Sequence, residues 1–186
     1  MPDGILEYDT RGWRRLGVRR RRALEERIFA QARDGFQYRY EGLRVPEADD
    51  LDDDADPLAC FARLMDSEPM LDMLRRITGA PDIGFSDGHA TAYSPGDFLT
   101  EHDDDVPGKG RVAAYVFGLT RVWRPEWGGI LMFHEGDGST VTGHVPRFNT
   151  LDLFAVPQQH SVSLVTPSAP VRRYAVTGWL RREESA

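Results

Sequence analysis

The part of the sequence that follows residue 83 constrains the fold most, because short runs rich in valine, isoleucine, threonine and aromatic residues alternate there with turn clusters. The clusters YSPGD, VPGKG, HEGDG and VPRFN recur at intervals of roughly ten residues. This pattern is typical of an antiparallel sandwich or barrel, and about eight strands suit a jelly roll. The predicted strands are 89–93, 97–104, 111–119, 129–134, 140–145, 150–155, 160–165 and 172–180.

Two helical segments precede these strands. Residues 23–35, ALEERIFAQARDG, place apolar side chains at every fourth position and end on glycine, which predicts an amphipathic helix. The arginine-rich segment 14–22 before it is either a surface for an anionic partner or a solvated face paired with nearby acids, and its composition favours the solvated face. The acidic segment 46–57, which contains the run 49–56, predicts an exposed loop.

Helical spacing returns at residues 58–78 and stops at a glycine. We therefore expect a single domain over residues 1–186, mainly β and of the α+β class. In this domain residues 1–80 supply supporting helices, and residues 83–182 form the jelly-roll core.

Composition excludes several classes of protein. The formal net charge of -7 disfavours a specific nucleic-acid partner. The single cysteine, Cys60, excludes an internal disulfide and a multi-cysteine metal site, and we expect it to be a small buried hydrophobe. Because no apolar run approaches the ~18 residues of a membrane span and no secretory pattern is present, we expect a soluble, cytoplasmic protein that binds no membrane.

Among the five histidines, only His102 has an acid two positions on, Asp104. Side chains at i and i+2 of a strand share a face, so this pair can hold one metal ion, although such a pair also arises by chance. Strand alternation would turn the Asp103 side chain away from the metal position and leave Asp105 one residue too far along the strand to reach it. The remaining histidines lack a partner acid at this spacing and are expected to be structural: His89, His134 and His144.

The context strengthens this pair. The turn YSPGD directs a strand toward His102 and Asp104, and the stretch PRFNTLDLF leads to His160. Strands of a jelly roll that are far apart in sequence can face each other, so His160 can join the pair. Two imidazoles and one carboxylate leave open positions on a metal, which suits non-haem Fe(II) with oxygen and a co-substrate.

An arginine pair in the last strand, RRYAVTGWL, supplies the next candidate. Alternation puts Arg173 and Thr177 on one face, and an inward arginine needs an anion. A dicarboxylate fits, with one end on the metal and the other on Arg173, while Thr177 adds a hydroxyl donor. The competing register, which turns Arg172 inward, remains open.

The stretch from Tyr93 to Leu180 resembles the prolyl-hydroxylase-like branch of the 2-oxoglutarate and Fe(II) dependent dioxygenases. The shared pattern is YxxGxxLxxHxD, then WGG with an apolar strand, a PxxN turn, an LxLF strand, a histidine and RYAVTGW. The resemblance implies a double-stranded β-helix, which is a jelly roll. The site residues that it implies are the iron ligands His102, Asp104 and His160, and Arg173 on the distal carboxylate of 2-oxoglutarate.

One departure from the family concerns 2-oxoglutarate binding. The family commonly carries a tyrosine on the strand after the HxD turn, but this chain has Gly118 there. Tyr93 is our candidate replacement. Further along, Arg111 faces substrate or solvent, and Trp123 and Trp127 either line a substrate groove or pack at the rim.

The resemblance implies an oxidoreductase that hydroxylates a C–H bond of a peptidyl or free proline-like substrate. Its cofactors would be Fe(II), 2-oxoglutarate and O2, with ascorbate as an auxiliary reductant and succinate and CO2 as products. Its partner would be a protein, a peptide or a small molecule, and no catalytic residue is expected beyond the metal centre. Two alternatives remain: a cupin-like metal- or ligand-binding jelly roll without oxidative activity, and a cupin-type hydrolase or isomerase.

Overall fold

The computed structural model describes residues 8–45 and 56–183. They divide into two compact units, and the boundary lies between Gln37 and Tyr38. That the whole chain is one domain stays a prediction. Most of the predicted acidic loop, 46–57, lies outside the described residues.

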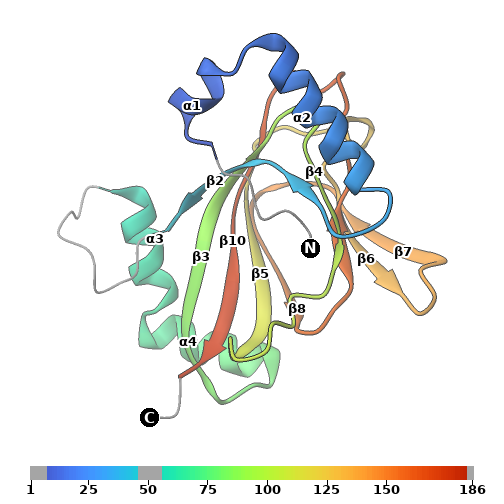
Figure 1. Ribbon diagram of the computed structural model, residues 1–186. Helices are drawn as coiled ribbons and strands as arrows, with labels where there is room; N and C mark the ends of the chain where they lie inside the picture. The colour runs from blue at the N-terminus through green and yellow to red at the C-terminus, as the bar shows by residue number, and fades with distance from the viewer. Residues whose placement is uncertain (1–7, 46–55, 184–186) are drawn as a thin grey trace. The chain divides into compact units, whose positions relative to one another are not determined.

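The first unit contains helix α1, Thr10–Arg15, and helix α2, Val18–Gln31 (Figure 1). The predicted helix is confirmed, but it begins earlier and includes four consecutive arginines. No residue of α2 is buried. Arg22 Nε lies 2.9 Å from Glu26 Oε1, which is the pairing with nearby acids expected for a solvated face.

The second unit begins with two short strands and then helices α3, Pro57–Met65, and α4, Glu68–Thr78. The side chain of Asp56 caps α3 by accepting a hydrogen bond from the backbone N–H of its second residue, Leu58. Pro69 stands in the first turn of α4, where its missing N–H has no intrahelical partner, and it therefore marks the start of a second helix. Gly79 ends α4 in the left-handed conformation, with φ of 69°.

One prediction for α3 is wrong. Cys60 is exposed, not buried. The buried residues of α3 are Ala59, Ala62 and Met65, so the helix turns its small side chains toward the protein and Cys60 away from it. Among the described residues, no helix is long and apolar enough to span a bilayer.

Ten strands within the described residues form two antiparallel five-stranded sheets, which confirms the predicted mainly β jelly roll (Figure 1). The larger sheet has the order β2-β3-β10-β5-β8, and the smaller has the order β1-β4-β9-β6-β7. The bounds are β1 Tyr38–Arg39, β2 Glu41–Arg44, β3 Ile83–Tyr93, β4 Phe98–His102, β5 Arg111–Leu119, β6 Leu131–Glu135, β7 Thr140–His144, β8 Phe148–Ala155, β9 His160–Val162 and β10 Arg173–Arg182.

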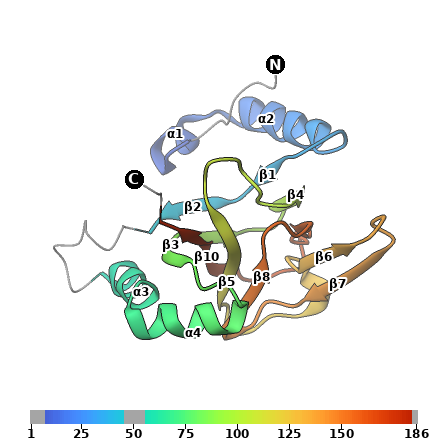
Figure 2. The same cartoon turned by 90° about the horizontal axis from the view of Figure 1, so that it is seen from below.

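Two hydrophobic clusters hold the second unit together. The outer cluster packs α3 and α4 on the larger sheet, as Figure 2 shows, with Leu74 and Leu180 fully buried in it. The inner cluster lies between the sheets and joins Tyr93 and Val116 of the larger sheet to Leu131 of the smaller one. The inner faces of the sheets therefore enclose the space into which the predicted site residues point.

The turn before β4 contains a buried carboxylate that fixes the start of the strand. Asp97 Oδ2 accepts a hydrogen bond of 2.7 Å from the backbone N–H of Ser94, and Asp97 Oδ1 lies 3.2 Å from Arg39 Nε. The Asp97 backbone oxygen also accepts from the N–H of Val165 at 2.9 Å. Burial raises the pKa of Asp97 to about 6.

This carboxyl gives a pH-dependent contribution to stability. Because its pKa rises from 3.8 when unfolded to about 6 when folded, the stability it adds is complete below pH 3.8 and is lost as the pH rises through 6. In urea denaturation between pH 4 and 7, Asp97→Asn should gain about 2 kcal/mol relative to the native chain. Asparagine keeps an acceptor for the turn. Parallel stability curves for the two proteins would contradict this.

Candidate metal centre

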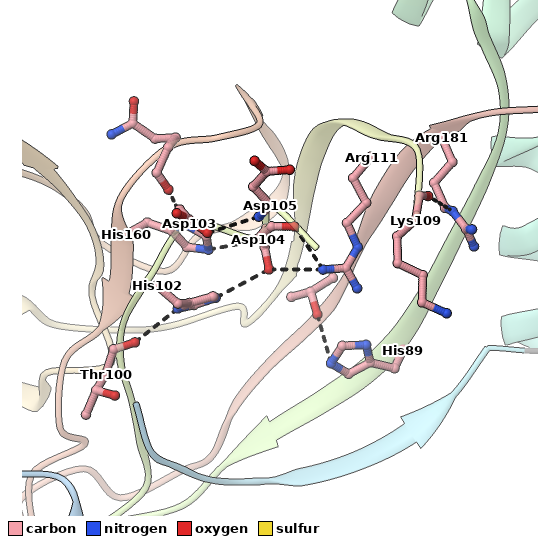
Figure 3. A network of polar contacts seen from close by, with 12 residues as sticks. His89, Thr100, His102, Asp103, Asp104, Asp105, Lys109, Arg111, His160 and Arg181 are labelled. Carbon is pink, nitrogen blue, oxygen red and sulfur yellow. Dashed lines mark hydrogen bonds and ion pairs between the residues drawn. The ribbon is translucent and has the colours of Figure 1, made fainter. Parts of the chain in front are cut away.

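Three side chains that the sequence singled out lie together. One ligand atom from each of His102, Asp104 and His160 lies within 4.8 Å of the others. His102 Nε2 is 3.5 Å from Asp104 Oδ1, and His160 Nε2 is 3.4 Å from Asp104 Oδ2 (Figure 3). His102 at the end of β4 lies opposite His160 at the start of β9 in the antiparallel register. Strand pairing therefore brings the early pair and the late histidine to one point.

Backbone carbonyl groups orient both imidazoles. His102 Nδ1 lies 3.0 Å from the carbonyl oxygen of Thr100, and His160 Nδ1 lies 2.7 Å from that of Gln158. Because a carbonyl oxygen only accepts, each Nδ1 donates a proton and each Nε2 keeps its lone pair. Burial, and then the neighbouring His102, lower the pKa of His160, which favours the neutral imidazole that a metal ligand requires.

This arrangement fits a divalent cation. Two lone pairs and a carboxylate face one another, and a cation turns that repulsion into binding. Backbone carbonyls that fix the second ring nitrogen are common behind metal-bound histidines. Two histidines and one carboxylate, with further positions open, are the donor set of non-haem Fe(II) oxygenases.

Asp104 reaches this point by a route that strand alternation did not predict. The strand β4 ends at His102, so the predicted strand 97–104 is too long at its C-terminal end. Asp104 has φ of 64°, the left-handed conformation that a non-glycine residue adopts only at a cost. Asp103 Oδ1 instead accepts from the backbone N–H of Asp105 at 3.0 Å. A strained turn therefore aims Asp104 and leaves the acids beside it outside the site.

Arg173 points into the barrel, and its surroundings fit a carboxylate. It is 3% exposed, and its Nη1 has no hydrogen-bond partner among the described residues. The Tyr93 ring lies against it, with 5.0 Å from the guanidinium carbon to the ring centroid. Arg172 is exposed and its Nη2 lies 3.1 Å from Glu41 Oε1. A buried guanidinium with a spare donor fits an anion that arrives from outside the chain, such as the distal carboxylate of 2-oxoglutarate.

Two further positions concern the co-substrate. Thr177 lies on the same face of β10 as Arg173, but its hydroxyl already has a protein neighbour, His89 Nε2, at 3.4 Å. A Cβ atom on Gly118 would lie 2.0 Å from the carbonyl oxygen of Arg147, so this strand has no room for the tyrosine common in the family. Tyr93 is the tyrosine that lies against Arg173.

The other unpaired polar atoms gather around Arg111. Four buried side-chain atoms lack a partner in the described part of the chain, and three of them belong to Asp87, Arg111 and Trp179. The Arg111 guanidinium carbon lies 3.6 Å from the Trp179 ring centroid, and Arg111 Nη1 donates to the backbone oxygen of Asp104 at 3.1 Å (Figure 3). A cavity of about 200 Å³ borders Asp87, His89 and Trp179.

Sequence reasoning missed a second histidine–acid pair. His144, for which no partner acid was expected, has its Nδ1 2.9 Å from Asp152 Oδ1. The available signal was the strand TLDLF, in which Asp152 and Phe154 share the face opposite the leucines.

The tryptophans of the WRPEW stretch belong to packing. Trp123 Nε1 donates to the carbonyl oxygen of Gly128 at 2.8 Å, and the rings of Trp123 and Trp127 lie 5.5 Å apart. Both pack against the inner cluster. Of the two readings that the sequence left open for them, the structure favours the packing role.

Residues 88–181 match the 2OG-Fe(II) oxygenase superfamily. The chain belongs to this superfamily. The protein is therefore an enzyme, and its cofactors are Fe(II), 2-oxoglutarate and O2. Membership of this superfamily supports an oxygenase rather than either of the two cupin-like alternatives. No curated protein matches the chain.

Solved structures of 2OG-Fe(II) oxygenases share the fold. A Pseudomonas putida prolyl-4-hydroxylase matches with a TM-score of 0.58 and 22% identity over 88% of this chain and 86% of that one. A Burkholderia pseudomallei oxidoreductase of the 2OG-Fe(II) oxygenase family matches with a TM-score of 0.60 and 14% identity over 96% and 83%. A Trichoplax adhaerens prolyl hydroxylase, solved with a peptide fragment of hypoxia inducible factor, matches with a TM-score of 0.59 and 17% identity over 86% and 79%.

Proposed function

We propose that this oxygenase hydroxylates a proline-like residue, either in a peptide or as a free amino acid. In this proposal His102, Asp104 and His160 hold the iron, and Arg173 binds the distal carboxylate of 2-oxoglutarate. Tyr93 packs against that arginine, and Thr177 lies four residues further along β10 on the same face. The bound cofactors supply the oxidant for a C–H bond, while 2-oxoglutarate leaves as succinate and CO2. That the enzyme acts in the cytoplasm stays a prediction from the sequence.

The observation that carries this proposal is a set of metal-ligand atoms in the same barrel as a buried cation. One ligand atom from each of His102, Asp104 and His160 lies within 4.8 Å of the others, and the buried Arg173 Nη1 has no hydrogen-bond partner among the described residues. A buried guanidinium nitrogen without a partner costs stability, so it is expected where a ligand compensates it. The proline-like substrate is supported by the fold shared with prolyl hydroxylases and by the sequence resemblance.

An anaerobic titration tests the proposal. Fe(II) followed by 2-oxoglutarate should give the weak visible charge-transfer band of a chelated co-substrate. Oxygen is then admitted in the presence of proline-containing peptides or of free proline, and succinate and the hydroxylated product are measured. A protein that binds Fe(II) and 2-oxoglutarate but hydroxylates neither probe would disprove the substrate and leave the oxygenase class intact.

We place the substrate beside Trp179 and Arg111, where the unpaired polar atoms lie. Trp179→Phe keeps an aromatic ring for Arg111 but removes the unpaired Nε1–H. We expect the KM for substrate to rise about fivefold, the loss of roughly one hydrogen bond, while KM for 2-oxoglutarate stays unchanged.

Trp123→Phe is the matched control, because the Nε1 of Trp123 bonds to Gly128 within the packed core. It should lower stability without changing KM for substrate. Equal substrate KM values for Trp179→Phe and the native enzyme would place the substrate elsewhere.

A further inference from the structure

A carboxylate and an imidazole with no part in metal binding lie at the closing edge of the barrel. Asp152 belongs to β8, the last strand of the larger sheet, and His144 belongs to β7, the last strand of the smaller one. His144 Nδ1 and Asp152 Oδ1 are 2.9 Å apart. The contact therefore joins an edge strand of one sheet to an edge strand of the other.

The carboxylate of Asp152 is on the inner face. Asp152 lies opposite Val116 on β5, and Val116 lies opposite Thr177 on β10, so the three side chains share one face with Arg173. Leu151 and Leu153, the neighbours of Asp152 in the chain, pack on the outer cluster instead. The Asp152 side chain is 22% exposed, so water screens its charge only in part.

This position creates an electrostatic conflict. The charge of Asp152 reaches Arg173 and raises the pKa of its guanidinium, against the larger lowering by burial. The same negative charge would repel a dicarboxylate that arrives at Arg173, and it offers that arginine a rival partner within the chain. An unrestrained carboxylate here would weaken co-substrate binding.

We propose that His144 is a positioning residue for 2-oxoglutarate, which acts by donating a hydrogen bond to Asp152 and so holding its carboxylate away from Arg173. The inference rests on the role proposed above for Arg173. Within the described residues His144 makes its hydrogen bond to Asp152 and a ring contact to Phe133, so we expect its effect to pass through Asp152.

The surroundings of His144 fix its ring for this task. Its centroid lies 5.3 Å from that of Phe133, which meets the ring edge to face. Phe133 in turn packs on Phe154 at 5.0 Å, and Phe154 packs on His160 at 4.7 Å. This aromatic row runs from the metal centre to His144 and limits the orientations from which the imidazole can reach Asp152.

Three variants test the inference: His144→Leu, Asp152→Asn and the double variant. The measurement is the Kd of 2-oxoglutarate for the Mn(II)-loaded full chain by titration calorimetry, with KM and kcat of the Fe(II) enzyme beside it. His144→Leu should raise this Kd about tenfold, the effect of one carboxylate charge that is no longer held away from Arg173 and is only partly screened. Asp152→Asn should lower it about threefold. The double variant should bind like Asp152→Asn, while kcat and the Kd of Mn(II) stay unchanged throughout.

Arg172→Leu is the control for charge alone, because it removes an exposed cation beside Arg173 and should leave Kd unchanged. If His144→Leu does not fold, His144→Gln replaces it, with an expected rise of about threefold, since glutamine keeps a donor on a more flexible side chain that restrains Asp152 less well. An unchanged Kd in the His144 variant, or a double variant as weak as His144→Leu, would overturn the proposal. If the native protein does not bind 2-oxoglutarate at all, the proposed function fails instead.

Discussion

Replacing Asp104 by alanine should abolish tight iron binding and succinate formation together. Mutation of a residue that hydrogen-bonds to a metal ligand already lowers metal affinity by about 10- to 100-fold. Loss of the only carboxylate ligand should therefore lower iron affinity by more than about a hundredfold. The remaining imidazoles of His102 and His160 carry no negative charge to offset that of the ion. Iron content after dialysis and succinate release at saturating 2-oxoglutarate measure the two effects.

Asp103→Ala is the matched control, because it removes a neighbouring carboxylate of the same charge. Asp103 accepts a hydrogen bond from the backbone of Asp105 and does not face the histidines, so the variant should keep nearly full iron occupancy. Loss of iron in Asp103→Ala together with its retention in Asp104→Ala would show that the carboxylate ligand had been assigned to the wrong residue.

The sequence predicted which residues meet, but not how they meet. His102 and Asp104 were paired through the alternation of a strand, whereas β4 ends at His102 and a left-handed residue turns Asp104 inward. Periodicity describes regular backbone only, and a single positive φ at a non-glycine residue leaves no periodic signal. The later histidine was predicted from the stretch PRFNTLDLF before it and from the family resemblance, and the structure pairs His160 with His102 across β9 and β4, with a register shift between Leu99 and His102.

The contact between His144 and Asp152 was missed by the sequence analysis. His144 and Asp152 stand on strands that belong to different sheets, so no ladder register relates them. The first two strands, β1 and β2, were also missed. They are only two and four residues long and sit at sheet edges, where pairing with a longer strand decides their conformation more than local propensity does.

The exchange of Arg173 for leucine should separate binding from stability. Without the guanidinium the distal carboxylate of 2-oxoglutarate loses a buried charged partner, an interaction for which truncation costs 2–5 kcal/mol, so the Kd should rise about a hundredfold. Arg172→Leu should change it less than twofold, because Arg172 is exposed and pairs with Glu41.

Arg173→Leu should also make the ligand-free protein more stable. Arg173 is 3% exposed with an unpaired Nη1, and burial lowers the pKa of its guanidinium, so the empty chain bears the cost of a poorly compensated charge. Leucine in that place should raise the melting temperature of the ligand-free protein, although the contact with the Tyr93 ring is lost. A lower melting temperature together with unchanged 2-oxoglutarate binding would make Arg173 a structural residue. If Arg173 is retained in order to bind 2-oxoglutarate, Arg173→Leu should bind 2-oxoglutarate more weakly and have a higher melting temperature without ligands.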